Sequence, residues 1–225
     1  MKLLSIDSTG KTAAVAVTEE NRILGEGFAD EGLTHSQTLL PLVDRTLKQA
    51  GLTIKEMDAF AVTNGPGSFT GLRIGCGLAK GLALGRPCIA VPTLMALAFN
   101  EEQSGRVAVS LLDARCHQVY MGAYSFEEGK PRSVIADQAC SAEEAAAQIK
   151  ALGKPAVLLG DGAYLLESLA DGETIILGQQ NDIQGPGIAR AAAFLEPKPP
   201  EELVPAYFRL SQAEREYQMR KEQTK

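Results

Sequence analysis

The chain opens with Lys2-Leu3-Leu4-Ser5-Ile6-Asp7-Ser8-Thr9-Gly10, a short apolar run that ends in an aspartate and a turn of small residues. Two further β-capable runs, 12–18 and 22–29, follow it across polar turns and predict a β-meander. Apolar residues then recur at helical spacing over 34–50 and 68–84, with strands expected at 58–63 and 88–91 and a third helix at 93–100. The first half is therefore predicted as β-β-β-α-β-α.

The same pattern starts again after the polar stretch 101–105, which we take as a linker. Its first strand, 106–113, also ends in an apolar-apolar-Asp step. Further elements are expected as strands at 116–126, 133–140, 156–159 and 174–177, and helices at 142–151, 163–169 and 188–195. The sequence thus predicts a duplicated α/β protein of two β-β-β-α-β-α subdomains, 1–104 and 105–225, in which 196–200 is a connector and the charged tail 211–225 forms a helix that packs back on the first subdomain.

The composition excludes several classes of protein. The 225 residues carry a net charge of −6, which argues against direct binding of a phosphate backbone. Two histidines and four widely spaced cysteines predict neither a zinc site nor a redox motif, and favour buried thiols in a reducing compartment. The first 20 residues carry no apolar signal core, and no apolar run approaches the ~20 residues of a membrane span, so we expect a cytoplasmic protein without a membrane partner.

Asp7 and Ser8 in the first turn are weak candidates for binding a phosphate or a metal-bound water. They serve equally well in a hairpin turn that satisfies its own backbone. Asp113 stands at the equivalent turn of the second half, but Arg115 occupies the place where a small residue is expected, and an Asp–Arg interaction is at least as good an explanation. No catalytic residue and no metal ligand can be assigned.

The strongest local motif is the glycine-rich run 65–75, which leads into the predicted helix 68–84. It lacks the Lys-Ser/Thr of a P-loop, so an anion cradle is a weak interpretation. Glycines at 71 and 75, and again at 77 and 81, lie one turn apart, and each costs roughly 1 kcal/mol relative to alanine. Each glycine pair leaves one side of the helix without side chains. We expect one of these sides to pack on the chain's own sheet and the other to contact a helix of a second polypeptide.

Several runs together resemble the TsaB (formerly YeaZ) family. They are 4–8, the run from His35-Ser36 to Leu40-Pro41, the glycine motif 65–75, Asp113-Ala114-Arg115, and Val204-Pro205-Ala206-Tyr207-Phe208-Arg209. This family belongs to the ASKHA group (acetate and sugar kinases, Hsp70, actin), whose duplicated fold agrees with the repeat. The resemblance implies a non-catalytic partner of TsaD, the transferase that moves threonylcarbamoyl from threonylcarbamoyl-AMP to the tRNA adenosine beside the anticodon. It also implies a TsaE ATPase in the assembly and a homodimer of the isolated chain.

In this family the first two helices, here 34–50 and 68–84, form the dimerisation surface. The residues expected to contact a partner are His35, Leu39, Leu40, Val43, Gly67, Phe69, Thr70, Gly71, Ile74, Gly75 and Leu78. TsaD-like metal binding needs a histidine pair one turn apart, whereas Leu39 follows His35 here. No cofactor is assigned, an ATP or ADP at the shared interface is left open, and tRNA is expected to be contacted only indirectly. The alternative is an active small-molecule kinase or a glycoprotease-like hydrolase.

Overall fold

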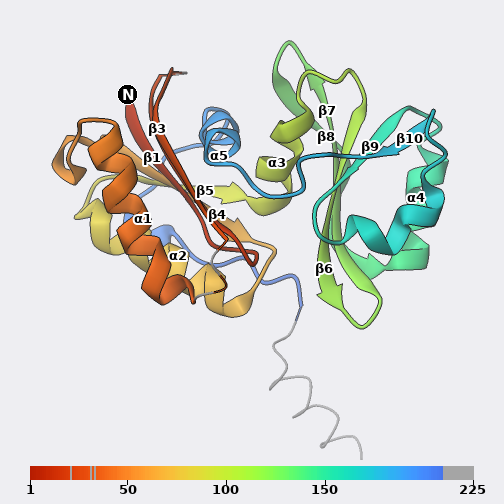
Figure 1. Cartoon of the computed structure of the whole chain (residues 1–225), viewed down its shortest axis with the longest axis horizontal. Helices are drawn as coiled ribbons and strands as arrows, with labels where there is room; N and C mark the ends of the chain where they lie inside the picture. The colour runs from red at the N-terminus through yellow and green to blue at the C-terminus, as the bar shows by residue number, and fades with distance from the viewer. Residues whose placement is uncertain (21, 31, 33, 210–225) are drawn as a thin grey trace, which may run out of the picture.

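The computed structural model describes residues 1–20, 22–30, 32 and 34–209, which form two five-stranded sheets side by side (Figure 1). The strands of the first sheet lie in the order β3-β2-β1-β4-β5. Its elements are β1 (Lys2–Asp7), β2 (Ala13–Glu19), β3 (Arg22–Ala29), α1 (His35–Gln49), η1 (Ile54–Glu56), β4 (Ala59–Gly65), α2 (Phe69–Ala83), β5 (Cys88–Pro92), α3 (Thr93–Ala98) and η2 (Phe99–Glu101).

The second sheet repeats this topology in the order β8-β7-β6-β9-β10. Its elements are β6 (Val107–Arg115), β7 (Gln118–Glu127), β8 (Lys130–Ser141), α4 (Ala142–Ala151), β9 (Ala156–Leu159), η3 (Ala163–Leu169) and β10 (Ile175–Leu177), followed by α5 (Gly185–Ala192) and η4 (Pro200–Glu202). In both halves the first strand is antiparallel to the second and parallel to the fourth. The predicted duplication is confirmed at the level of strand order.

The central strands of the first sheet are buried on both faces, and this explains their apolar sequences. Along β1, Leu4 and Ile6 point to the core beneath α1 and α2, whereas Leu3 points to the core shared with α3 and α5. In β4, Phe60 likewise joins the first of these cores and Ala61 the second. A strand that is covered on both faces reads as a continuous apolar run, because successive side chains alternate between the two cores.

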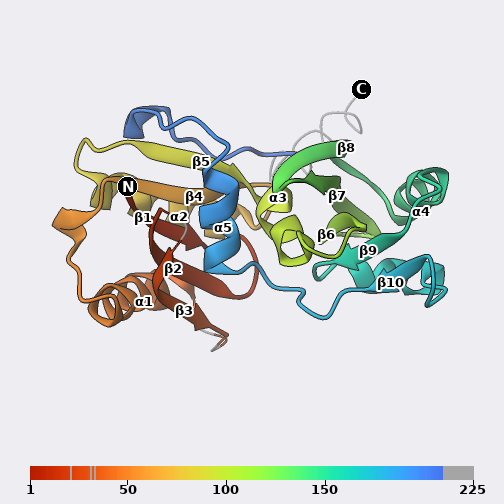
Figure 2. The same ribbon diagram turned by 90° about the horizontal axis from the view of Figure 1, so that it is seen from above.

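Figures 1 and 2 show how the layers follow one another. Helices α1 and α2 cover the outer face of the first sheet, α5 and α3 fill the space between the two sheets, and α4 with η3 covers the far face of the second sheet. The core around α3 contains side chains of both halves, among them Val91 and Tyr124. Among the described residues, α1 and α2 therefore form one outer helical layer of the molecule, and α4 with η3 forms the other.

The predicted boundary at residue 104 needs one correction, because the end of the chain returns to the first half. Helix α5 packs on β1 and β2, and Leu203 is buried in the core beneath α1 and α2. The backbones of Cys88 and Lys198 exchange two hydrogen bonds of 2.8 Å. Residues 185–206 thus complete the first half, and only long-range packing reveals it.

Smaller differences from the sequence-based expectations are local. The helix predicted at 163–169 is the 3-10 helix η3, and the one predicted at 188–195 begins earlier, as α5. Three of the four free cysteines are buried as expected, whereas Cys116 is exposed in the β6–β7 turn. Within the described residues, no helix is long and apolar enough to cross a membrane. The tail 211–225 lies outside the described residues.

Candidate functional site

The first candidate, Asp7, is buried at the end of β1, and one of its two carboxylate oxygens is hydrogen-bonded within the chain. Its Oδ1 accepts hydrogen bonds from the Thr9 backbone N–H at 3.2 Å, the Thr9 hydroxyl at 2.7 Å and the Thr63 hydroxyl at 2.5 Å. Burial raises the pKa of the Asp7 carboxyl, and these hydrogen bonds together with nearby His35 oppose that rise. Such a carboxylate ties the turn to β4, which is the structural alternative considered for this residue.

Ser8 and the glycine motif pack against each other. The Ser8 hydroxyl donates to the carbonyl of Gly71 at 2.9 Å. A Cβ on Gly71 would collide with the Ser8 carbonyl oxygen, and one on Gly75 would crowd its hydroxyl. The Ser68 side chain accepts from the Gly71 N–H at 3.3 Å and so caps α2. The first turn of α2 is thus occupied by the β1–β2 turn, which leaves the motif a packing role.

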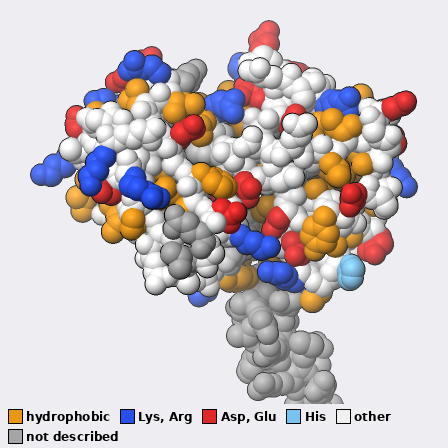
Figure 3. Space-filling view, viewed as in Figure 1, with side chains coloured by type: hydrophobic (Ala, Val, Ile, Leu, Met, Phe, Trp, Pro, Cys, Tyr) orange, Lys and Arg blue, Asp and Glu red, His pale blue; other side chains and the backbone are white. Residues whose placement is uncertain are grey.

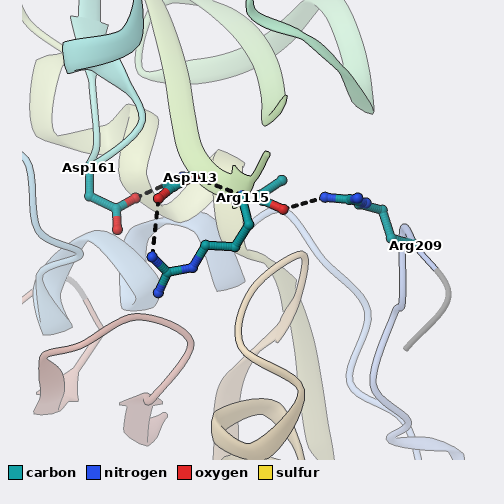
Figure 4. Close-up of polar contacts among 5 residues, drawn as sticks. Asp113, Arg115, Asp161 and Arg209 are labelled. Carbon is teal, nitrogen blue, oxygen red and sulfur yellow. Dashed lines mark hydrogen bonds and ion pairs between the residues drawn. The ribbon is translucent and has the colours of Figure 1, made fainter. Parts of the chain in front are cut away.

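The turn between β6 and β7 contains an Asp–Arg interaction, which the sequence offered as the alternative to a phosphate site (Figure 4). Asp113 Oδ1 accepts from the Arg115 backbone N–H at 2.7 Å, and Asp113 Oδ2 lies 3.5 Å from the Arg115 guanidinium. The Asp113 N–H donates to Asp161 at 3.0 Å, and Arg209 donates to the carbonyl of Ala114. Figure 3 shows acidic and basic side chains gathered in the hollow between the two halves. The turn is held by contacts within the chain.

His35 is also used within the chain. Its Nε2 lies 2.9 Å from the carbonyl oxygen of Gly10, and its ring approaches the site of a Gly71 side chain. Leu39, one turn later, is buried in the core. Among the described residues no group of three His, Cys, Asp or Glu side chains could hold a metal ion. The donor set does not fit the histidine-pair metal site of a TsaD-like enzyme.

The residues expected to contact a partner divide into three groups. Buried inside the chain are Leu39, Val43, Gly71 and Gly75; half-buried are His35, Gly67, Phe69, Ile74 and Leu78; exposed are Leu40 and Thr70. The core beneath α1 and the β1–β2 turn already occupy the surroundings of the four buried residues, and their contact with a partner stays a prediction. Other positions on these helices are more accessible.

The outward side of α2 supplies such positions. No atom of the described residues lies within 4 Å of a Cβ built on Gly77 or Gly81, and both residues are exposed. Arg73 precedes them at helical spacing, and Leu84 follows with 78% of its surface exposed. On the neighbouring helix α1, Leu40 is 52% exposed. The spacing of the four glycines predicts two helix faces without side chains. It does not show which of the two pairs faces outward.

A second feature that sequence reasoning missed is the C-terminal segment 204–209, which crosses from one half to the other. Tyr207 stacks on Phe69 with ring centroids 4.5 Å apart, and its hydroxyl accepts a hydrogen bond from Arg73 Nε at 2.8 Å. The Ala206 N–H donates to the Asn64 carbonyl at 2.6 Å. The motif Val204-Pro205-Ala206-Tyr207-Phe208-Arg209 was part of the family resemblance, but the sequence assigned it no role. In the structure it connects α2 to the end of β6.

Comparisons with known proteins agree on one family. The family model described as TsaD, tRNA N6-adenosine threonylcarbamoyltransferase, matches residues 32–204. The tRNA threonylcarbamoyladenosine biosynthesis protein TsaB of Bacillus subtilis is 30% identical over 230 residues, which cover 95% of this chain and 96% of that protein. The Escherichia coli protein of the same name is 37% identical over 133 residues, or 57% of each chain.

Solved structures show the same fold. A Pseudomonas aeruginosa protein described as similar to peptidase YEAZ is 30% identical, with a TM-score of 0.82 over 92% of this chain and 99% of that one. The Acidaminococcus fermentans (R)-2-hydroxyglutaryl-CoA dehydratase component A, at 12% identity, has a TM-score of 0.52 over 87% of this chain and 97% of that one. The duplicated ASKHA fold predicted from the sequence is confirmed.

Proposed function

Because the chain belongs to the TsaB family of tRNA threonylcarbamoyladenosine biosynthesis proteins, we propose that it is the non-catalytic subunit that supports a TsaD-type transferase. It binds that subunit through the outward faces of α1 and α2 and allows it to transfer threonylcarbamoyl to the tRNA adenosine beside the anticodon. A TsaE-type ATPase joins the assembly, the isolated chain pairs with a second copy of itself, and the complex works in the cytoplasm.

The observation that carries this proposal is the open outward side of α2. Gly77 and Gly81 leave the backbone of a 15-residue helix bare, at a cost of about 2 kcal/mol of helix propensity relative to two alanines. Glycines one turn apart let a second helix approach closely. No described residue uses that space, so the cost has no compensation within the free chain.

Helix α1 extends this surface. It packs beside α2 on the outer face of the first sheet, and its exposed residues include Leu40 and Pro41 as well as the ion pair between Lys48 and Asp44, at 2.6 Å. Exposed leucines at 40 and 84 supply the apolar contact area, and the glycines supply the close approach. A pair of helices from a paralogous subunit is the partner that fits such a surface.

The turn residues support a non-catalytic role. Asp7 accepts three hydrogen bonds from its own chain, Ser8 is bonded to Gly71, and Asp113 is bonded to the Arg115 backbone. A general acid or base must reach a substrate proton, and a metal ion needs several neighbouring ligands, a grouping that is absent among the described residues. Tight ATP binding that is lost in Asp7→Ala would favour the kinase or hydrolase alternative instead.

The interface is tested by the double variant Gly77→Leu/Gly81→Leu. Since both positions open to solvent, the free chain should fold as before, whereas a partner helix would be overpacked by about 1 to 3 kcal/mol at each position. Association with the TsaD-type subunit should weaken at least 30-fold, as measured by isothermal titration calorimetry or co-elution. Ala147→Leu on the exposed side of α4 is the matched control.

The supporting role is tested by reconstituting transfer to an unmodified tRNA. The TsaD-type subunit should need this chain for full activity, and the double variant should fail to restore it. Full transfer without the chain would contradict the proposed role. Unchanged association of the double variant would instead contradict the assigned surface and leave the role standing.

A further inference from the structure

The C-terminal segment brings together a strip of arginines and aromatic rings that spans the two halves, which we call the arginine–aromatic strip. It consists of Arg73, Arg115, Tyr207, Phe208 and Arg209. Tyr207 is 43% exposed although it stacks on Phe69, and Phe208 is 37% exposed although it packs edge-on against Tyr120. Arg209 anchors the end of the strip by donating to the Ala114 carbonyl (Figure 4).

The arginines keep much of their hydrogen-bonding capacity. Arg73 donates through Nε to Tyr207, and within the described residues its two terminal nitrogens have no hydrogen-bond partner. Arg115 has a side chain that is 77% exposed, and it is paired with Asp113 at 3.5 Å through one nitrogen. Asp113 is ion-paired with Arg115, and Asp161 also interacts electrostatically with Arg115, so two carboxylates lie beside the three arginines of the strip. The strip is thus locally cationic on a chain whose net charge is −6.

This combination has a characteristic ligand. Exposed aromatic rings provide platforms on which unstacked bases lie, and arginine guanidinium groups bind phosphate oxygens in a bidentate way. Arginine suits this task better than lysine, because its planar guanidinium both pairs with phosphate and stacks on rings. A duplex hides its base faces, so a surface of this kind selects single-stranded RNA over double-stranded RNA.

We propose that the arginine–aromatic strip contacts single-stranded RNA of the tRNA substrate, an inference that rests on the proposed function. The RNA lies along 204–209 as far as Arg115, whose side chain is turned toward Asp113 at the edge of the hollow. The expectation of an indirect tRNA contact came from the net charge of the whole chain. Electrostatic attraction to a polyanion instead depends on the charge at the contact, because screening limits its range to about 8 Å at physiological salt.

The test measures RNA affinity of the assembled complex with the TsaD-type subunit. The probes are an unmodified tRNA transcript, its anticodon stem–loop, and a double-stranded RNA of equal charge, each titrated by fluorescence anisotropy at several salt concentrations. The variants are Arg73→Gln/Arg115→Gln and Tyr207→Ala. Arg132→Gln is the matched control, since it removes an exposed, ion-paired arginine in β8. Co-elution of each variant with the partner is measured in parallel.

The double arginine variant should lower the magnitude of the salt slope for the stem–loop by about 0.7 per lost phosphate contact. Tyr207→Ala should weaken binding of the stem–loop about 5-fold or more, since it removes a stacking platform. Tyr207→Phe keeps the ring and loses the hydrogen bond to Arg73, so it should bind RNA as the unsubstituted chain does. Arg132→Gln should change nothing.

Other outcomes overturn the inference and are separable from failure of the proposed function. Unchanged RNA affinity in an intact complex removes the strip as an RNA contact and leaves the subunit role in place. Equal losses for double-stranded RNA show a contact that does not read unstacked bases. Loss of co-elution in these variants assigns the strip to the protein interface. If the unsubstituted chain forms no complex at all, the proposed function and this inference fail together.

Discussion

The two glycine pairs of α2 look alike in the sequence and do opposite things in the structure. Gly71 and Gly75 face inward, where the Ser8 carbonyl and hydroxyl occupy the space of their missing side chains. Gly77 and Gly81 face outward, and no atom of the described part of the chain lies within 4 Å of a Cβ built there. The first pair allows the β1–β2 turn to pack on α2, and the second leaves a helix surface that no residue in 1–20, 22–30, 32 or 34–209 covers.

This difference shows that one residue type marks two kinds of contact. An inward glycine is required by a close approach within the fold, so its replacement should cost stability. An outward glycine lowers the stability of the free helix, so its replacement should raise stability and cost association. The predictions below separate the two.

Gly71→Leu should have the largest effect. The new side chain would meet the backbone of Ser8 and drive the β1–β2 turn off α2, at a cost of about 3 kcal/mol in the free energy of unfolding. Urea denaturation measures this, with Gly77→Leu as the same substitution on the open side. Equal loss of stability in both variants would mean that the two sides do not differ.

Gly77→Ala and Gly81→Ala should each stabilise the free chain by about 1 kcal/mol, because alanine restricts the unfolded chain and favours the helix. Thermal unfolding at several protein concentrations is the measurement, since pairing of two copies would add a concentration-dependent contribution. A loss of stability at high dilution would show that these positions are packed within the chain.

The smallest effect on the free energy of unfolding is expected for Asp7, which lies at the β1–β2 turn that packs on Gly71. The pKa of Asp7 is raised in the folded state, so the folded chain holds its proton more tightly than the unfolded chain. Asp7 therefore contributes stability below its unfolded pKa of about 3.9, and that contribution is lost as the pH rises through the higher folded value. Asp7→Asn should flatten this part of the profile of unfolding free energy against pH. An unchanged profile would show that Asp7 titrates alike in both states.

Most of the fold could be predicted because its signals are local. Strand-like runs such as 3–7 and 59–62 are apolar on both faces, and the two halves repeat one order of elements. The return of 185–206 to the first half could not be predicted, since a helix such as α5 shows an apolar stripe without showing which sheet it covers.

The candidate site was predicted in part for a similar reason. The sequence identified Asp7, Ser8 and Asp113 at strand ends, and it gave weight to both a functional and a structural role for them. Hydrogen bonds to Thr63 and Gly71, both far along the chain, hold Asp7 and Ser8 within the fold, and the linear sequence does not show them. Tyr207 was quoted in a motif, but its stacking on Phe69 depends on two segments that meet only in the folded chain.

The sequence by itself determined the class of fold, its duplication, the missing histidine pair and the family, because periodicity, residue type and motif order are properties of the linear chain. The tertiary structure alone decided which glycines face outward, where 185–209 packs, and that the arginines and rings of one strip lie together in a chain of net negative charge. These three features depend on distances between residues that are remote in sequence. The packing of the two sheets on α3 sets those distances.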